Sequence, residues 1–145
     1  MRSSAPTINK TKLSKIFTME VREHPEKPGR SITDVWNIRK PLLKGFENNY
    51  SYIVTLREKG NIAGNHYHEK KQELVYPIMG TFTVALENIE SKEREEISFE
   101  TAKHQVVYFP TRIAHVIRAE TKNAVFLVIT TSTETEEDMI HYKVL

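Results

Sequence analysis

The chain has 145 residues, a length that suits a single domain with a hydrophobic core of its own. Lys and Arg number 21 against 19 Asp and Glu, with both signs mixed along the chain, so no basic stripe for nucleic acid is expected. There is no cysteine, which excludes disulfides and thiolate ligands, so a bound metal would need nitrogen and oxygen ligands. The first thirty residues lack the apolar segment of a signal peptide and no apolar run could span a membrane, so a cytoplasmic location is the default.

The N-terminal part of the chain is polar and rich in turn-forming residues. Residues 1–12 are expected to form a loose arm, and residues 13–21 fit either a short strand or one or two helical turns. Prolines and a glycine between residues 23 and 30 predict a turn-rich connection. We therefore expect a partly flexible N-terminal arm over residues 1–30 and a folded domain over residues 31–145.

From residue 32 onward, short strand candidates recur every eight to twelve residues, with turn signals between them. The alternation is clearest in residues 81–87, where Phe82, Val84 and Leu86 share one face. This spacing predicts an all-β sandwich or barrel. The expected strands are 33–38, 50–56, 63–68, 73–79, 81–87, 95–99, 105–109, 115–118 and 124–131.

The most informative segment lies between Gly60 and Gly80 and contains two histidines separated by one residue. His66 and His68 would project from the same face of a strand, because side chains alternate with a period of two. Glu73 follows a tight turn and can return beside them from the next strand. Two imidazoles and a carboxylate on one face suit a divalent metal such as Zn, Fe, Ni or Mn. His115, which follows a turn at Pro110, is the fourth ligand candidate.

This pattern resembles the first motif of the cupin superfamily, G-x5-H-x-H-x3/4-E-x6-G, at every fixed position. The second cupin motif, G-x5-P-x-G-x2-H-x3-N, is matched at Pro110 and His115. His104, Arg112 and Ala119 stand where that motif has its two glycines and its asparagine. The resemblance covers roughly residues 50–131 and implies a jelly-roll barrel, also called a double-stranded β-helix. It also implies a metal in the barrel mouth, held by His66, His68, Glu73 and His115.

The residues around the two histidines narrow the resemblance to particular cupin families. Residues 64–68, Gly-Asn-His-Tyr-His, are similar to a segment in the C-terminal cupin domains of capsular polysaccharide-synthesising sugar-nucleotide reductases. They look more loosely like the nucleotide-sugar 3,4-ketoisomerases. The reductase domains imply zinc, with Fe, Ni or Mn as alternatives that the ligand types also suit, and both families imply a sugar nucleotide as the small-molecule substrate. The implied reaction is proton transfer next to a keto group, of the isomerase or epimerase type.

Other residues near these motifs are candidates for substrate contacts and catalysis. Arg112 lies just before the last ligand, where it could bind a phosphate or carboxylate of the substrate or remain a solvated loop charge. A left-handed backbone, as the glycine of the second motif would allow, is poorly tolerated by an arginine. The general base is not identified; Tyr76, Tyr108 and His104 are candidates by position. Lys70 and Lys71 are expected on the surface.

Three alternatives remain open at the level of the sequence. The same ligands suit a mononuclear iron or nickel oxygenase. The barrel could instead be a non-catalytic module that binds a small molecule. A metal-free pocket is also physically sensible, with one histidine as general base oriented by Glu73.

The N-terminal arm and the strand expected around Trp36 are candidates for forming a homodimer, since a neighbouring chain can cover an open barrel edge.

Overall fold

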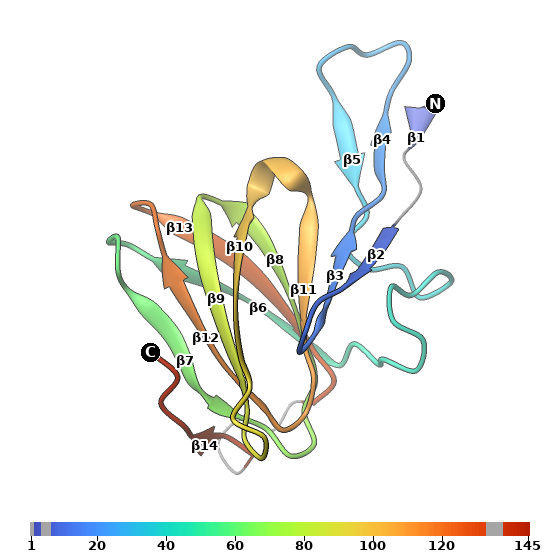
Figure 1. Cartoon of the computed structure of the whole chain (residues 1–145). Helices are drawn as coiled ribbons and strands as arrows, with labels where there is room; N and C mark the ends of the chain where they lie inside the picture. The colour runs from blue at the N-terminus through green and yellow to red at the C-terminus, as the bar shows by residue number, and fades with distance from the viewer. Residues whose placement is uncertain (1, 4–6, 133–137) are drawn as a thin grey trace.

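The computed structural model describes residues 2–3, 7–132 and 138–145, and β-strands make up nearly all of the regular structure in these ranges (Figure 1). The one exception among them is a short 3-10 helix, η1 (Thr101–Lys103). In the same part of the chain, no helix has the length and hydropathy needed to cross a membrane. The predicted all-β class is confirmed.

The strands from Tyr50 to Thr130 agree closely with the predicted ones. All eight strands expected in this region are present, and their bounds differ from the prediction by at most two residues. They are β6 (Tyr50–Leu56), β7 (Ile62–Tyr67), β8 (Glu73–Met79), β9 (Thr81–Asn88), β10 (Arg94–Glu100), β11 (Gln105–Phe109), β12 (Ile113–Ala119) and β13 (Ala124–Thr130). Three further strands join them: β2 (Thr7–Lys10), β3 (Lys15–Thr18) and β14 (Ile140–His141).

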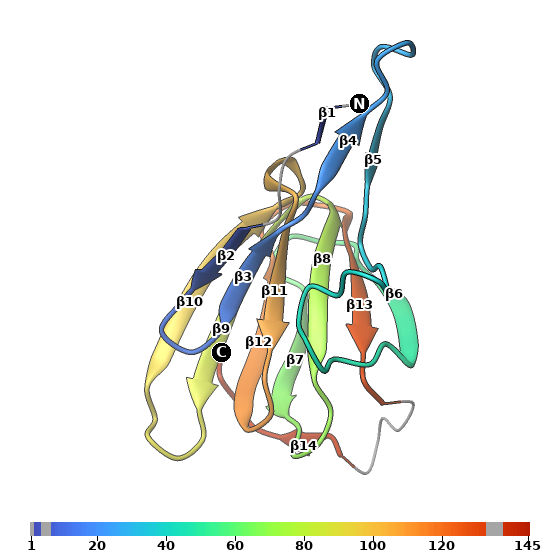
Figure 2. The same ribbon diagram turned by 90° about the vertical axis from the view of Figure 1, so that its right-hand side faces the viewer.

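These strands form two antiparallel sheets that face each other as a sandwich rolled into a barrel (Figures 1 and 2). One sheet has five strands in the order β10-β9-β12-β7-β14, and the other has six in the order β2-β3-β11-β8-β13-β6. Most consecutive strands from β6 to β14 cross from one sheet to the other, which is the jelly-roll arrangement. Most of these strands therefore pair with at least one partner far away in the sequence, whereas β2–β3 and β9–β10 are hairpins.

The N-terminal residues contribute to the barrel and to a separate projection. β2 lies within the segment expected as a loose arm, yet it pairs with β3 at the edge of the six-stranded sheet. β1 (Arg2–Ser3), β4 (Val21–Glu23) and β5 (Ser31–Thr33) form a small sheet whose hairpin stands clear of the barrel (Figures 1 and 2). The domain boundary expected between residues 30 and 31 falls where this hairpin enters β5.

The strand predicted over residues 33–38 is wrong. β5 ends at Thr33, and Asn37 then closes a turn by accepting the backbone N–H of Arg39 at 2.9 Å on its side-chain oxygen. Trp36 instead packs against Phe46, with ring centroids 5.3 Å apart, in an apolar cluster on the outer face of the six-stranded sheet. A covering loop, rather than a strand, thus holds Trp36 against the barrel.

The main core lies between the two sheets. Phe82 has its ring 5.1 Å from that of Phe99 and 5.4 Å from that of Phe126, so aromatic side chains from both sheets meet here. The predicted inward face of β9 is confirmed, because Phe82, Val84 and Leu86 are all fully buried. Toward the end of the barrel where β7 stops and β12 starts, buried polar side chains replace this apolar filling.

Candidate metal centre

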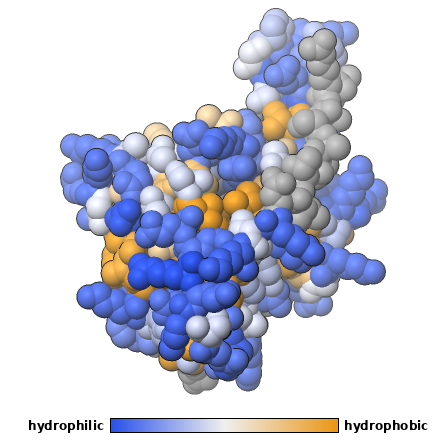
Figure 3. All heavy atoms as spheres, in the orientation of Figure 1, coloured by the Kyte–Doolittle hydropathy of each residue, from blue (hydrophilic) through white to orange (hydrophobic). Residues whose placement is uncertain are grey.

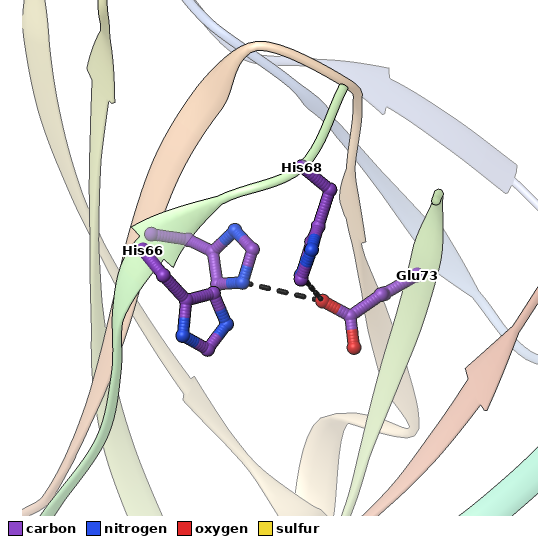
Figure 4. A group of neighbouring side chains, drawn as sticks. His66, His68 and Glu73 are labelled. Atoms are coloured by element: carbon purple, nitrogen blue, oxygen red, sulfur yellow. Dashed lines mark hydrogen bonds and ion pairs between the residues drawn. The ribbon is translucent and has the colours of Figure 1, made fainter. Parts of the chain in front are cut away.

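Four predicted ligands converge inside the barrel. His66 lies near the end of β7, and His68 follows directly after that strand. Glu73 is the first residue of β8, and His115 lies on β12. Each offers one ligand atom, and these atoms all lie within 4.8 Å of one another. Figure 4 shows His66, His68 and Glu73 pointing toward a common centre. The structure thus brings together all four of the residues that the motifs single out.

A β-bulge in β7 brings the rings of His66 and His115 together. His66 is opposite His115 in the pairing of β7 with β12, whereas the next partners are Gly64 and Val116. Asn65 is the extra residue and adopts a left-handed backbone with φ of 63°. The two imidazole rings that result, His66 and His115, have centroids 4.8 Å apart in an edge-to-face arrangement.

The hydrogen bonds of the cluster test whether a cation fits it. The Nδ1 of His68 lies 2.6 Å from the main-chain oxygen of Asp138, and the Nδ1 of His115 lies 3.3 Å from that of Ile113. These nitrogens must carry protons, because a carbonyl oxygen only accepts. In a neutral ring the Nε2 atoms then hold lone pairs, yet they lie 3.0 and 3.2 Å from the same oxygen of Glu73.

The Nε2 lone pairs and the carboxylate of Glu73 repel each other at these distances. A positive charge is therefore needed, either as a cation between them or as a proton on the rings. Ligands bonded to one metal at about 2.0–2.2 Å lie about 3.0–3.5 Å apart, which matches these separations. Because three imidazoles and one carboxylate are also nitrogen and oxygen donors that Zn²⁺, Fe²⁺, Ni²⁺ and Mn²⁺ accept, the residues present fit a divalent cation.

The pKa values of the cluster favour the forms that bind a metal. Burial, helped by the nearby His115 and His68, lowers the pKa of His66 from 6.5 to about 3, so its ring is neutral at pH 7. Burial by itself would raise the pKa of Glu73, but the neighbouring rings of His115 and His68 outweigh burial and hold this pKa well below its usual value. A neutral imidazole and an ionised carboxylate need lose no proton when a cation binds.

The turn before His115 adopts the conformation that the second cupin motif prescribes. Arg112 has φ of 62°, so this arginine accepts the left-handed backbone that was expected to suit it poorly. Its backbone N–H donates to the carbonyl of His68 at 2.8 Å, which ties the turn to a ligand residue. Its guanidinium forms ion pairs with Glu69 and Glu90 at the surface.

The three candidates for the general base lie away from the four ligands. Tyr76 and Tyr108 pack in the apolar cluster on the outer face of the six-stranded sheet, and the hydroxyl of Tyr108 donates to Gln72 at 2.6 Å. His104 follows η1, which joins β10 to β11 at the far end of the barrel from β14 (Figure 1). The structure therefore does not bring these three residues to the cluster.

Tyr52 is a tyrosine that does reach the four-residue cluster, and the sequence analysis did not predict it. Its hydroxyl donates to Glu73 at 3.2 Å, and burial followed by the charge of Glu73 raises its pKa. Tyr52 lines a cavity of about 60 Å³ together with His66, Glu73 and His115. The alternation along β6 carries the signal, because Tyr52, Val54 and Leu56 share the face that turns inward.

Lys71 is a second residue whose position differs from the prediction made from the sequence. It was expected on the surface, but only 3% of it is exposed. Its positive charge contributes to lowering the pKa of His66, so it lies close to the cluster. Within the described ranges no carboxylate forms an ion pair with its ammonium group. A buried cation thus stands beside the four ligands.

A jelly-roll barrel with three histidines and a glutamate gathered inside it defines a cupin. Residues 44–138 match the family model described as polysaccharide biosynthesis C-terminal domain, and the chain belongs to this family. The predicted resemblance to cupins is therefore confirmed. A comparison with curated proteins finds no match.

Solved structures of similar fold include sugar-nucleotide enzymes. A dTDP-6-deoxy-D-glucose 3,5-epimerase from Legionella pneumophila, in complex with dTDP-4-keto-L-rhamnose, superposes with a TM-score of 0.79 at 13% identity, covering 97% of this chain and 79% of that one. A dTDP-4-dehydrorhamnose 3,5-epimerase from Bacillus anthracis gives 0.77 at 11% identity, with 93% and 82% covered. A 3,4-ketoisomerase from Thermoanaerobacterium thermosaccharolyticum gives 0.72 at 17% identity, with 90% and 88% covered. At these identities the likeness establishes the shared fold.

Proposed function

We propose that this protein is a metal-dependent cupin that isomerises or epimerises a 4-keto sugar nucleotide by proton transfer next to the keto group. The observation that carries the proposal is the buried cluster of three histidines and one glutamate, with Tyr52 hydrogen-bonded to it, inside a jelly-roll barrel. The family model and the sugar-nucleotide enzymes of the same fold point to the same substrate class.

In this proposal His66, His68, Glu73 and His115 hold the metal, with zinc as the first choice. When bound there, a divalent ion would supply Lewis-acid stabilisation for the negative charge that develops on the substrate oxygen. The buried Lys71, whose charge helps to lower the pKa of His66, would add positive charge near this site, where low polarity makes a charge more effective than in water.

Tyr52 is the proton-transfer group that the geometry favours over Tyr76, Tyr108 and His104. Its phenol carries a proton at neutral pH and its hydroxyl lies beside Glu73, so in this proposal it donates a proton to the enolate carbon. The cavity that it lines is about 60 Å³, and a water molecule occupies about 30 Å³ in the liquid. Only the reacting edge of a sugar can enter such a space, so the nucleotide would lie outside the barrel.

Arg112 is proposed to bind a phosphate or carboxylate of the substrate. Its guanidinium is partly exposed near the end of the barrel where the ligands lie, and it would have to leave Glu69 and Glu90 to reach an anion. Exposed ion pairs of this kind contribute little free energy because water screens them, so a phosphate can compete with them.

We also propose a homodimer formed through the β4–β5 hairpin. This hairpin stands clear of the barrel, and Ile32 on it is 42% exposed. Figure 3 shows apolar surface where the hairpin leaves the barrel, among mostly hydrophilic neighbours. A second chain packed there would remove this surface from water.

Solvent exchange tests the reaction directly. The protein, purified without a histidine tag, should contain zinc by elemental analysis, and it should wash deuterium from D₂O into a TDP- or UDP-linked 4-keto-6-deoxy sugar. Mass spectrometry of the sugar measures this exchange. E73Q should lose both zinc and exchange, whereas H141A, which changes an exposed histidine outside the cluster, should retain both.

Other results would favour other functions. Stoichiometric iron with oxygen consumption would replace the proposal with an oxygenase, since the same ligands bind iron. A rise in melting temperature with the sugar nucleotide but no exchange would indicate a binding module without catalysis.

A further inference from the structure

A short segment that we name the strap, residues 138–145, lies along β7, the strand that carries His66 and ends just before His68. Within it, β14 pairs with β7, placing Ile140 opposite Tyr67 and His141 opposite His66. The backbone N–H of Tyr142 donates to the carbonyl of Asn65 at 2.9 Å, which extends the pairing past the bulge. Figure 1 shows β14 at the end of the barrel where β7 stops.

The bulge residue anchors the far end of the strap. The side-chain oxygen of Asn65 accepts the backbone N–H groups of Val144 and Leu145 at 2.9 and 3.2 Å. Its side-chain nitrogen donates to the carbonyl of Leu145 at 3.2 Å. Val144 is 5% exposed and packs against Ala85, Ala114 and Val116. The strap is therefore held by backbone pairing, a side-chain clamp and apolar packing.

Asp138, at the near end of the strap, makes three contacts with the segment that joins two ligands and one with a ligand ring. Its Oδ1 accepts the backbone N–H of Glu69 at 2.8 Å, and its Oδ2 accepts those of Lys70 and Lys71 at 3.1 and 2.8 Å. Its main-chain oxygen accepts the Nδ1–H of His68 at 2.6 Å. One residue thus holds the whole turn between His68 and Glu73 and one of the ligand rings as well.

These contacts set the geometry on which a metal would depend. The turn of residues 69–71 determines how far His68 lies from Glu73, and three consecutive N–H groups on one carboxylate fix its shape. The bond at Nδ1 fixes the orientation of the imidazole and leaves Nε2 directed at Glu73, 3.0 Å away. Without the carboxylate, water would satisfy the three N–H groups but would not hold them in place.

We propose that Asp138 is a positioning residue of the metal centre, which places His68 and the turn 69–71 for the cation from a site 70 residues further along the chain. The inference rests on the metal-dependent function proposed above. An aspartate that merely stabilised a surface turn would affect the melting temperature but would leave the intrinsic affinity for the metal unchanged.

The test compares D138A and D138N with wild-type protein and with K143A, which changes an exposed residue of the same strap. Zinc affinity is measured by competition with a chromophoric chelator, and hydrogen exchange of the amides of residues 69–71 is measured in the metal-free proteins. We expect D138A to bind zinc about 10- to 100-fold more weakly, the range typical for partners that orient metal ligands. Its amides 69–71 should exchange faster, whereas K143A should match wild type. D138N, whose amide oxygen still accepts, should lie between the two.

Circular dichroism and melting curves separate this effect from unfolding, and D138N carries the measurement if D138A folds poorly. Zinc affinity of D138A within twofold of wild type, or unchanged exchange at residues 69–71, would overturn the inference while the proposed function stood. Weaker zinc binding in D138A, combined with no deuterium exchange into sugars by wild type, would support the inference and remove the proposed reaction. A wild-type protein that takes up no divalent metal would remove both.

Discussion

The face of the strand on which a tyrosine lies separates Tyr52 from Tyr76 and Tyr108. All three lie in strands of the six-stranded sheet, but only Tyr52 turns toward the cavity, where its hydroxyl donates to Glu73. Tyr76 shares the outer face with Leu74, two residues before it, because side chains alternate. Position along the strand, rather than residue type, decides which phenol can act on a substrate.

We expect Y52F to slow deuterium exchange into the sugar by about 100-fold or more, the scale of general acid catalysis. Zinc content should stay the same, since Tyr52 is not among the four ligands. Y108F removes a hydroxyl from the outer face of the same sheet and should leave the exchange rate unchanged. A normal rate in Y52F with a slow rate in Y108F would reverse the assignment of the proton donor.

At the scale of elements, the bulge in β7 connects the fold with the site. Gly64 has φ of 116°, and a Cβ built on it would lie 2.6 Å from the carbonyl oxygen of His115 and 2.9 Å from the Cα of Val116. Both contacts are with backbone, which cannot move aside without shifting β12. Gly64 therefore allows β7 to approach the strand that carries the third histidine.

The bulge predicts different costs for two glycine substitutions. G60A keeps a positive φ but has no atom within 4 Å of the new Cβ, so only the left-handed backbone is strained, at about 1–2 kcal/mol. G64A should add about 1–3 kcal/mol for the clash with β12 and should weaken zinc binding, because His115 moves. Chemical denaturation and chelator competition measure the two effects. Equal destabilisation by G60A and G64A would contradict this account.

The covering loop after β5 shows where an element prediction failed. Residues 33–38 contain Val35 and Trp36, which favour a strand, yet the segment lies as an irregular cover on the sheet. Turn formation by Asn37 and packing of Trp36 on Phe46 outweigh the local preference for a strand. The strands within the barrel were predictable because regular alternation and turn residues agreed there.

At the scale of the whole molecule, the hairpin formed by β4 and β5 is the part that the barrel does not support. We expect light scattering at micromolar concentration to give twice the mass of one chain. I32D, on the hairpin, should shift the protein toward the monomer, because a charge in an apolar contact costs free energy. I62D changes a similarly exposed isoleucine on β7 and should leave the dimer intact. A wild-type protein that is monomeric under these conditions would contradict the proposal.

The amino-acid sequence by itself determined the class of fold and the set of candidate ligands. Strand alternation and the spacing of His66 and His68 are local properties, and a period of two places both rings on one face whatever the rest of the chain does. The turns that precede Glu73 and His115 are also specified by short segments of the sequence. These are the features that a reader of the sequence can derive from neighbouring residues.

Only the tertiary structure decided what surrounds the ligands. The inward position of Tyr52, the burial of Lys71 and the contact of Asp138 with His68 depend on strands that are distant in sequence. No local pattern specifies such contacts, because the jelly roll pairs β6, β7, β8 and β12 with strands from elsewhere in the chain. The free energy that orients a ligand ring here comes from a carbonyl 70 residues away, and only the folded barrel brings the two together.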